Sequence, residues 1–106
     1  MAEKIIVLIT AATKDEANRI ARSLVEDRLA ACVNIVHGVQ SIFYWEGAIR
    51  DEQETLLIAK SRAQHMEKII ERVKSLHSYE VPEIIALPIV AGSRRYLDWV
   101  QEMTKR

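Results

Sequence analysis

The chain has 106 residues, of which 49 % are hydrophobic and 28 % are charged, the composition of a single ordinary globular domain. Lys and Arg together number 15 and so do Asp and Glu, so the formal net charge is zero, whereas proteins that bind phosphate backbones normally carry a basic excess. The only cysteine, Cys32, excludes an intrachain disulfide and a multi-cysteine zinc site, which is typical of a reducing compartment.

The first expected element is a strand over residues 5–9, where Ile and Val residues flank a single Leu. A continuous run of this kind predicts a central strand that is covered on both faces. The run is too short to cross a membrane, and residues 1–4 lack the basic start and small-residue cleavage site of a signal peptide. We therefore expect a cytoplasmic location and no membrane partner.

A capping box, Thr-Lys-Asp-Glu at residues 13–16, predicts the start of a helix that ends near Arg28. A long strand is expected from residue 32 to residue 45, followed by a Glu-Gly turn at residues 46–47. The returning strand is clearest over residues 55–60. Together these segments predict a long β-hairpin.

A second capping box is expected at residues 61–64, before a helix with one apolar face. Residues 84–89 predict a fourth strand, and because proline lacks a backbone donor, Pro88 predicts that this strand lies at a sheet edge or ends there. A last helix follows residues 92–93 and carries Tyr96 and Trp99. The order β-α-β-β-α-β plus a C-terminal helix predicts one α+β domain over residues 1–106, the ferredoxin-like sandwich.

The long hairpin indicates association, because the helices of this fold cover one sheet face while residues 32–45 are apolar in both phases. At about 3.3 Å per residue its first strand would span roughly 40 Å, whereas a compact domain of this size is about 34 Å across. Gly38 is the expected site of a bulge that bends the hairpin. We expect the tip residues Phe43, Tyr44 and Trp45 to pack on a neighbouring subunit. The alternative is two shorter strands joined by a loop, in a monomer.

Three segments resemble the CutA divalent-cation tolerance family: Leu-Ala-Ala-Cys-Val-Asn-Ile at 29–35, Ser-Ile-Phe-Tyr-Trp-Glu-Gly at 41–47 and His-Ser-Tyr-Glu-Val-Pro-Glu-Ile at 77–84. The resemblance implies a ferredoxin-like subunit, a homotrimer whose hairpins wrap neighbouring subunits, and a cytoplasmic role in tolerance of metals such as copper. It also implies similarity to the trimeric PII signalling proteins, which bind small effectors between subunits.

The family resemblance also implies a copper site in some members, formed by a cysteine late in the first strand and two adjacent histidines. This chain has Ile9 and Leu76 at two of these positions, so only His77 matches. His77 and Glu83 are the candidate metal ligands, because imidazole and carboxylate suit Cu²⁺ or another divalent cation. The alternative is that His77 interacts with the carbonyls at the end of its helix.

The candidate ligand-binding cleft comprises Lys60, Tyr79, Glu80 and Trp45, since an ammonium at the end of an apolar strand needs an anion. A structural Lys–Glu pair at the subunit junction is the alternative. No P-loop, nucleophile elbow or dinucleotide motif occurs, so no enzymatic activity is expected. The sequence thus predicts a trimer that binds divalent metal at subunit clefts. A PII-like sensor of a small anionic metabolite and a scaffold for a protein partner are the alternatives.

Overall fold

The computed structural model describes residues 3–106, so Met1 and Ala2 of the N-terminal start lie outside the described residues. The elements are β1 (Lys4–Ala11), α1 (Lys14–Glu26), β2 (Cys32–Trp45), β3 (Ala48–Arg62), the 3-10 turn η1 (Ala63–His65), α2 (Met66–Leu76), β4 (Ile84–Pro88) and α3 (Arg94–Met103). The strands form one antiparallel sheet in the order β2-β3-β1-β4. The predicted α+β, ferredoxin-like order is confirmed. No helix among the described residues is long and apolar enough to cross a membrane.

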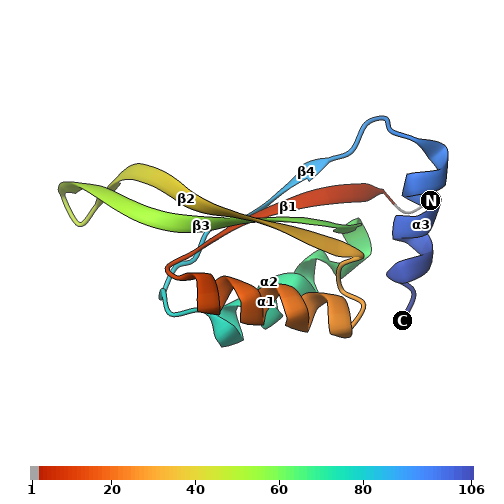
Figure 1. Cartoon of the computed structure of the whole chain (residues 1–106), viewed down its shortest axis with the longest axis horizontal. Coiled ribbons are helices and arrows are strands. Elements are labelled where there is room, and N and C mark those ends of the chain that lie inside the picture. Colours follow the sequence, from red (N-terminus) through yellow and green to blue (C-terminus); the bar gives the residue numbers. More distant parts are fainter. Residues whose placement is uncertain (1–2) are drawn as a thin grey trace.

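Helices α1 and α2 lie side by side on one face of the sheet, and α3 lies at its end (Figure 1). The hydrophobic core fills the space between this helix layer and the sheet. Its fully buried large side chains include Ile9 and Leu57 from the sheet and Leu24, Ile69 and Val73 from the helices. The second face of the sheet carries no helix layer, so its side chains are left uncovered or only partly covered within one chain.

Strand β1 lies between β3 and β4, as its apolar run predicts, but it is not covered on both faces. Ile5, Val7 and Ile9 are buried under the helices, whereas Ile6 and Leu8 remain half-buried on the other face. The prediction of two-sided cover is wrong within a single chain, because both core helices pack on the same side.

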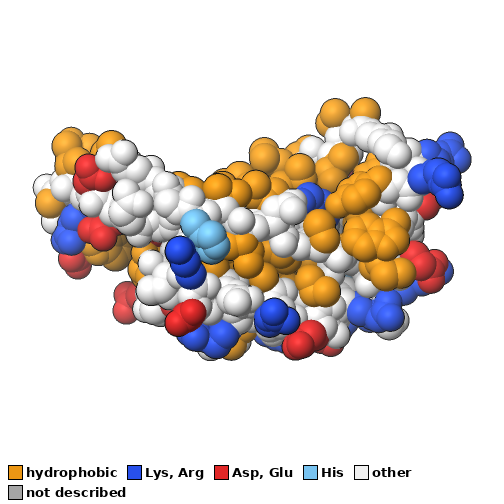
Figure 2. Space-filling view, in the orientation of Figure 1, with side chains coloured by type: hydrophobic (Ala, Val, Ile, Leu, Met, Phe, Trp, Pro, Cys, Tyr) orange, Lys and Arg blue, Asp and Glu red, His pale blue; other side chains and the backbone are white. Residues whose placement is uncertain are grey.

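The uncovered face, here called the open face, is an apolar surface several strands wide. Leu8 pairs with Ile58 of β3 on one side and Ile85 of β4 on the other, so the three side chains share this face. Ile6, Val36, Leu56 and Leu87 extend the same surface. Ile85 and Leu87 are about half exposed, and Figure 2 shows hydrophobic side chains along the upper side of the molecule over the sheet. A contiguous apolar surface of this kind marks an interaction site.

The β2–β3 hairpin projects beyond the rest of the domain (Figure 1). Pairing of β1 with β3 stops at Ala11 and Thr55, so residues 39–45 and 48–54 pair only with each other. The chain is 44 Å long and only 25 Å and 22 Å in the other directions. The register shifts between Val36 and Val39, where Gly38 has a φ of +74°. The predicted overhang and bulge are confirmed, and the alternative of two shorter strands is wrong.

The two predicted capping boxes have different outcomes. At the first, Thr13 Oγ1 accepts a hydrogen bond from the Glu16 N–H at 3.1 Å, as expected. At the second, Ser61 lies within β3 and its hydroxyl donates to the Leu29 carbonyl, so it caps no helix. The second prediction is wrong because β3 continues to Arg62 and a 3-10 turn precedes α2.

Strand β4 lies at the edge of the sheet and ends at Pro88, which confirms the prediction from that proline. Hydrogen bonds to Thr104 hold the C-terminal end of the last helix, α3. The Arg62 guanidinium donates to the Thr104 hydroxyl at 2.9 Å, and His65 Nε2 lies 2.7 Å from the Thr104 carbonyl oxygen.

Candidate functional site

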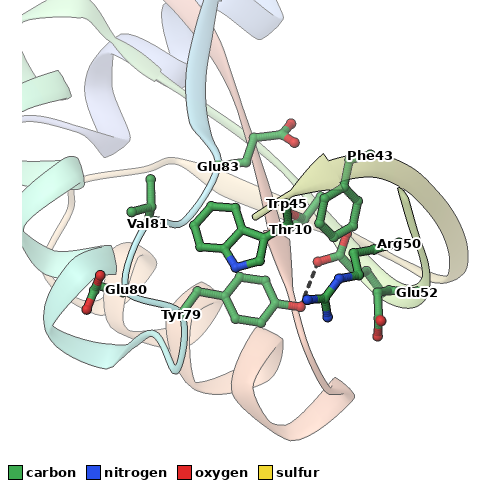
Figure 3. A pocket seen from close by; sticks show the side chains of 10 residues that line it. Thr10, Phe43, Trp45, Arg50, Glu52, Tyr79, Glu80, Val81 and Glu83 are labelled. Carbon is green, nitrogen blue, oxygen red and sulfur yellow. Dashed lines mark hydrogen bonds between the residues drawn. The ribbon is translucent and has the colours of Figure 1, made fainter. Parts of the chain in front are cut away.

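A cleft of about 500 Å³ lies between the projecting part of the hairpin and the loop of residues 77–83 (Figure 3). Its lining combines three aromatic rings, four carboxylates, one guanidinium and two smaller side chains. These residues are Thr10, Phe43, Trp45, Arg50, Glu52, Glu54, Tyr79, Glu80, Val81 and Glu83.

The hairpin side of the cleft follows from strand geometry. Arg50, Glu52 and Glu54 alternate along β3, so they project to the same face. Phe43 pairs with Arg50 across the hairpin and joins them on that face, and Trp45 follows two residues further along β2. One face of the projecting hairpin therefore presents a charged row beside two aromatic rings.

Tyr79 connects the loop to the hairpin. Its hydroxyl donates a hydrogen bond of 2.8 Å to Glu54 Oε2, the dashed line in Figure 3, and Glu54 is only 7 % exposed. Burial raises the pKa of Tyr79 far above its usual value, and the bonded Glu54 carboxylate adds to the effect. The phenol therefore stays protonated, and the bond holds the loop against the hairpin.

The imidazole of His77 is fully buried and both of its nitrogens are bonded to backbone. Nδ1 accepts a hydrogen bond from the Tyr79 N–H at 3.0 Å, and Nε2 lies 2.6 Å from the Thr10 carbonyl oxygen, to which it donates. Because Nδ1 is the acceptor it carries no proton, so its 3.4 Å approach to Glu16 Oε2 is not an ion pair. His77 thus joins the loop to the end of β1 and has no lone pair available to a metal in this conformation.

Glu16, at the start of α1, holds the loop of residues 77–83 by a hydrogen bond from the Ser78 N–H, a role that the sequence analysis missed. Its carboxylate is 4 % exposed and accepts hydrogen bonds from the N–H groups of Ser78 at 3.0 Å and Ala12 at 3.3 Å. Burial by itself raises the pKa of Glu16, but the hydrogen bonds outweigh it and leave the pKa below its usual range. The only sequence signal for Glu16 was its place in the capping box.

Four of the residues predicted for the ligand-binding cleft or the metal site line the cleft: Trp45, Tyr79, Glu80 and Glu83. Lys60 does not. It lies on the same face of β3 as Glu54 but six residues away, roughly 20 Å along the strand. Its ammonium donates to the Asn34 side-chain oxygen and, at 3.5 Å, to the Ile58 carbonyl. Among residues 3–106 no carboxylate lies within 4.0 Å of it, so Lys60 as a cleft residue stays a prediction for the assembled protein.

His77 and Glu83, the predicted metal ligands, are not presented together by one chain. Glu83 lines the cleft, whereas His77 is buried beside Thr10 and does not line it. Within the part of the chain that the structure describes, no group of three or more His, Cys, Asp or Glu side chains could hold a metal ion. The metal assignment therefore stays a prediction and would need donors from more than one subunit.

Charge in the cleft is strongly uneven. Glu52, Glu80 and Glu83 make no ion pair within residues 3–106, and the same holds for Arg50. Four carboxylates face one guanidinium, so the cleft attracts cations and repels anions. The sequence analysis missed Arg50, Glu52 and Glu54, although their alternation in the polar half of the hairpin could have indicated a shared face.

Cys32 lies at the other end of the open face and is half-buried. Its Sγ is 3.5 Å from the Tyr96 hydroxyl, and the Tyr96 ring is tilted against Trp99 with centroids 5.5 Å apart. The hydrogen bond with Cys32 and partial burial raise the pKa of Tyr96 to about 12. Tyr96 and Trp99 are each about 40 % exposed, so this end of the open face is also apolar and only partly covered within one chain.

Comparison with known proteins shows which family this chain resembles. A family profile described as "CutA1 divalent ion tolerance protein" matches residues 5–103. The divalent-cation tolerance protein CutA of Thermus thermophilus is 54 % identical over 99 residues, which cover 93 % of this chain and 96 % of that protein. Protein CutA 1, chloroplastic, of Oryza sativa is 44 % identical over 95 % of this chain and 57 % of its own length. The solved structure of the divalent cation tolerance protein Cut A1 from Thermus thermophilus matches with a TM-score of 0.94 at 52 % identity, covering 96 % of this chain and 99 % of that one.

Proposed function

Since the chain belongs to the CutA1 divalent ion tolerance family, we propose that it acts as a homotrimer that binds divalent cations in the clefts where its subunits meet. The observation that carries the proposal is the cleft itself. It collects four carboxylates around one guanidinium, yet a single chain offers no closed set of metal donors among the described residues.

Assembly is supported by two apolar surfaces that a single chain leaves uncovered. The open face exposes Ile85 and Leu87. The hairpin projects beyond the domain (Figure 1), and the aromatic rings at its tip are exposed. Burying both surfaces in a closed, symmetric oligomer would remove them from water, and three copies would have a mass of 3 × 12.1 = 36.3 kDa.

The charge of the cleft favours a cation over the anionic metabolite of the PII-like alternative. Carboxylate oxygens are ligands for divalent cations, and Glu52 and Glu83 make no ion pair within residues 3–106. His77 would add an imidazole ligand only after releasing the Tyr79 N–H or the Thr10 carbonyl. We therefore propose that the carboxylates are the primary donors and that binding is weak and poorly selective.

Replacing Glu83 with glutamine is expected to weaken divalent-cation binding by roughly tenfold, because the variant removes one anionic donor while keeping the shape of the side chain. Calorimetric titration of the trimer with Cu²⁺, Zn²⁺ and Mn²⁺ measures the effect. Glu71→Gln is the matched control, since Glu71 lies exposed on α2 away from the cleft and its loss should leave the affinity unchanged.

His77→Ala completes this experiment. Unchanged copper affinity in a folded His77→Ala trimer would show that the imidazole is not a ligand. Equal affinities of wild type, Glu83→Gln and Glu71→Gln would contradict metal binding in the cleft. If neither metal nor a metabolite panel binds, the scaffold alternative gains.

We propose the cytoplasm as the location, in keeping with a chain whose only cysteine is Cys32. The relative from Oryza sativa is named as chloroplastic, so members of the family are not confined to one compartment.

A further inference from the structure

We infer that the cleft also receives an organic cation, an alkylammonium or quaternary ammonium group small enough to lie against its aromatic wall. The inference goes beyond divalent-cation binding and does not depend on it. Its starting point is that a cleft of about 500 Å³ lies within the size range of small-molecule sites, well above the needs of a single metal ion.

The aromatic wall is the feature that metal binding leaves unexplained. Figure 3 shows the rings of Trp45 and Tyr79 beside one another in the cleft, with Phe43 on the hairpin side. A divalent ion binds oxygen or nitrogen lone pairs, so it gains little from the faces of aromatic rings. An organic ammonium sheds its weak hydration readily and is attracted to ring faces, most strongly to that of tryptophan.

The polar groups of the cleft select the sign of the ligand. The Tyr79 hydroxyl is already bonded to Glu54, so this side chain offers a ligand its ring rather than a donor. Glu52, Glu80 and Glu83 make no ion pair within residues 3–106 and can neutralise an ammonium held at the rings. Arg50 is the one cationic group among the described residues that line the cleft, so an anionic ligand meets an excess of like charge.

The test uses two probes of similar size and shape, tetramethylammonium and neutral tert-butanol. The chain has two tryptophans, so the Trp99→Phe background makes Trp45 the only tryptophan reporter, and Trp99 is not among the residues that line the cleft. We expect a saturable change in Trp45 fluorescence on addition of tetramethylammonium and at least tenfold weaker binding of tert-butanol.

Two substitutions locate the site, with calorimetry as the readout because one of them removes the reporter. Trp45→Ala is expected to weaken tetramethylammonium binding by roughly fivefold to thirtyfold, while Trp45→Phe keeps a ring and most of the affinity. Glu83→Gln is expected to weaken it by roughly threefold to tenfold, and Glu71→Gln should not change it. The mass of each variant is measured in parallel, and Glu83→Gln tests the site if Trp45→Ala alters the oligomer.

Equal affinity for the charged and the neutral probe would overturn the inference, as would the lack of saturable binding of tetramethylammonium to the intact oligomer. If the wild-type protein binds Mn²⁺ but not tetramethylammonium, only this inference is overturned. If it binds tetramethylammonium but not Mn²⁺, the metal proposal is overturned and the organic cation site is retained.

Discussion

Replacing Tyr44 and Trp45 together with alanine is expected to dissociate the trimer into 12.1 kDa subunits at micromolar concentration. The two rings occupy opposite faces of β2 at the tip of the projecting hairpin, where Tyr44 is 77 % and Trp45 is 43 % exposed in a single chain. Large aromatic anchors at interfaces commonly contribute about 2 kcal/mol or more each, so the pair should weaken association by roughly a thousandfold.

The matched control is the double variant Tyr44→Phe and Trp45→Phe, which keeps apolar rings at both positions. It should remain trimeric at the same concentration, as measured by light scattering coupled to size exclusion. A trimer of unchanged mass and unchanged dissociation constant in the alanine variant would show that the hairpin tip is not an interface anchor.

Replacing Glu16 with alanine is expected to lower the free energy of unfolding by about 2–4 kcal/mol. The carboxylate is buried and accepts hydrogen bonds from the Ser78 and Ala12 N–H groups, which the alanine variant would leave without their anionic partner. The loop of residues 77–83 should loosen as well, since Ser78 precedes the Tyr79 ring of the cleft. Urea denaturation measures the stability, with Glu71→Ala on the exposed face of α2 as the control. A loss below about 0.5 kcal/mol would contradict the anchoring role, since exposed substitutions commonly change stability by that little.

The same carboxylate predicts a pH dependence. The pKa of Glu16 is lower in the folded chain than in the unfolded chain, so its stabilising contribution is complete above the unfolded value of about 4.3. It is lost as the pH falls through the lower folded pKa. The difference in unfolding free energy between wild type and Glu16→Gln should therefore be constant near pH 7 and shrink below about pH 4. A difference that stays constant down to about pH 2 would show that Glu16 has the same pKa in the folded and the unfolded chain, which would contradict a carboxylate stabilised by the Ser78 and Ala12 N–H groups.

The fold could be predicted from local patterns because each pattern has a direct physical cause. Pro88 lacks a backbone donor and lies on an edge strand, and Gly38 adopts the positive φ of a bulge. The errors arose where a local signal had two outcomes. Ser61 matches a capping box, yet β3 continues through it and its hydroxyl bonds Leu29 instead. The apolar run of β1 indicates two covered faces, but within one chain the helices cover only one of them.

The site could be predicted only in part, because it depends on which distant residues meet. The segment around Tyr79 and the tip residue Trp45 were identified, and both line the cleft. Lys60 lies on the same face of β3 about 20 Å from Glu54, so it does not line the cleft of one chain, and its place in a cleft between subunits stays a prediction. Glu16 was missed because its contacts with Ser78 join segments 62 positions apart, a pairing that no local spacing reveals.

The measurement that tests the account most directly is the mass of the untagged protein across a concentration series, by sedimentation equilibrium. If copies of this chain cover the open face and the projecting hairpin, as proposed, a single species of 36.3 kDa, three times 12.1 kDa, should persist to low micromolar concentration. A folded species of 12.1 kDa at high concentration would contradict the assembly, and with it the shared clefts to which cation binding is assigned.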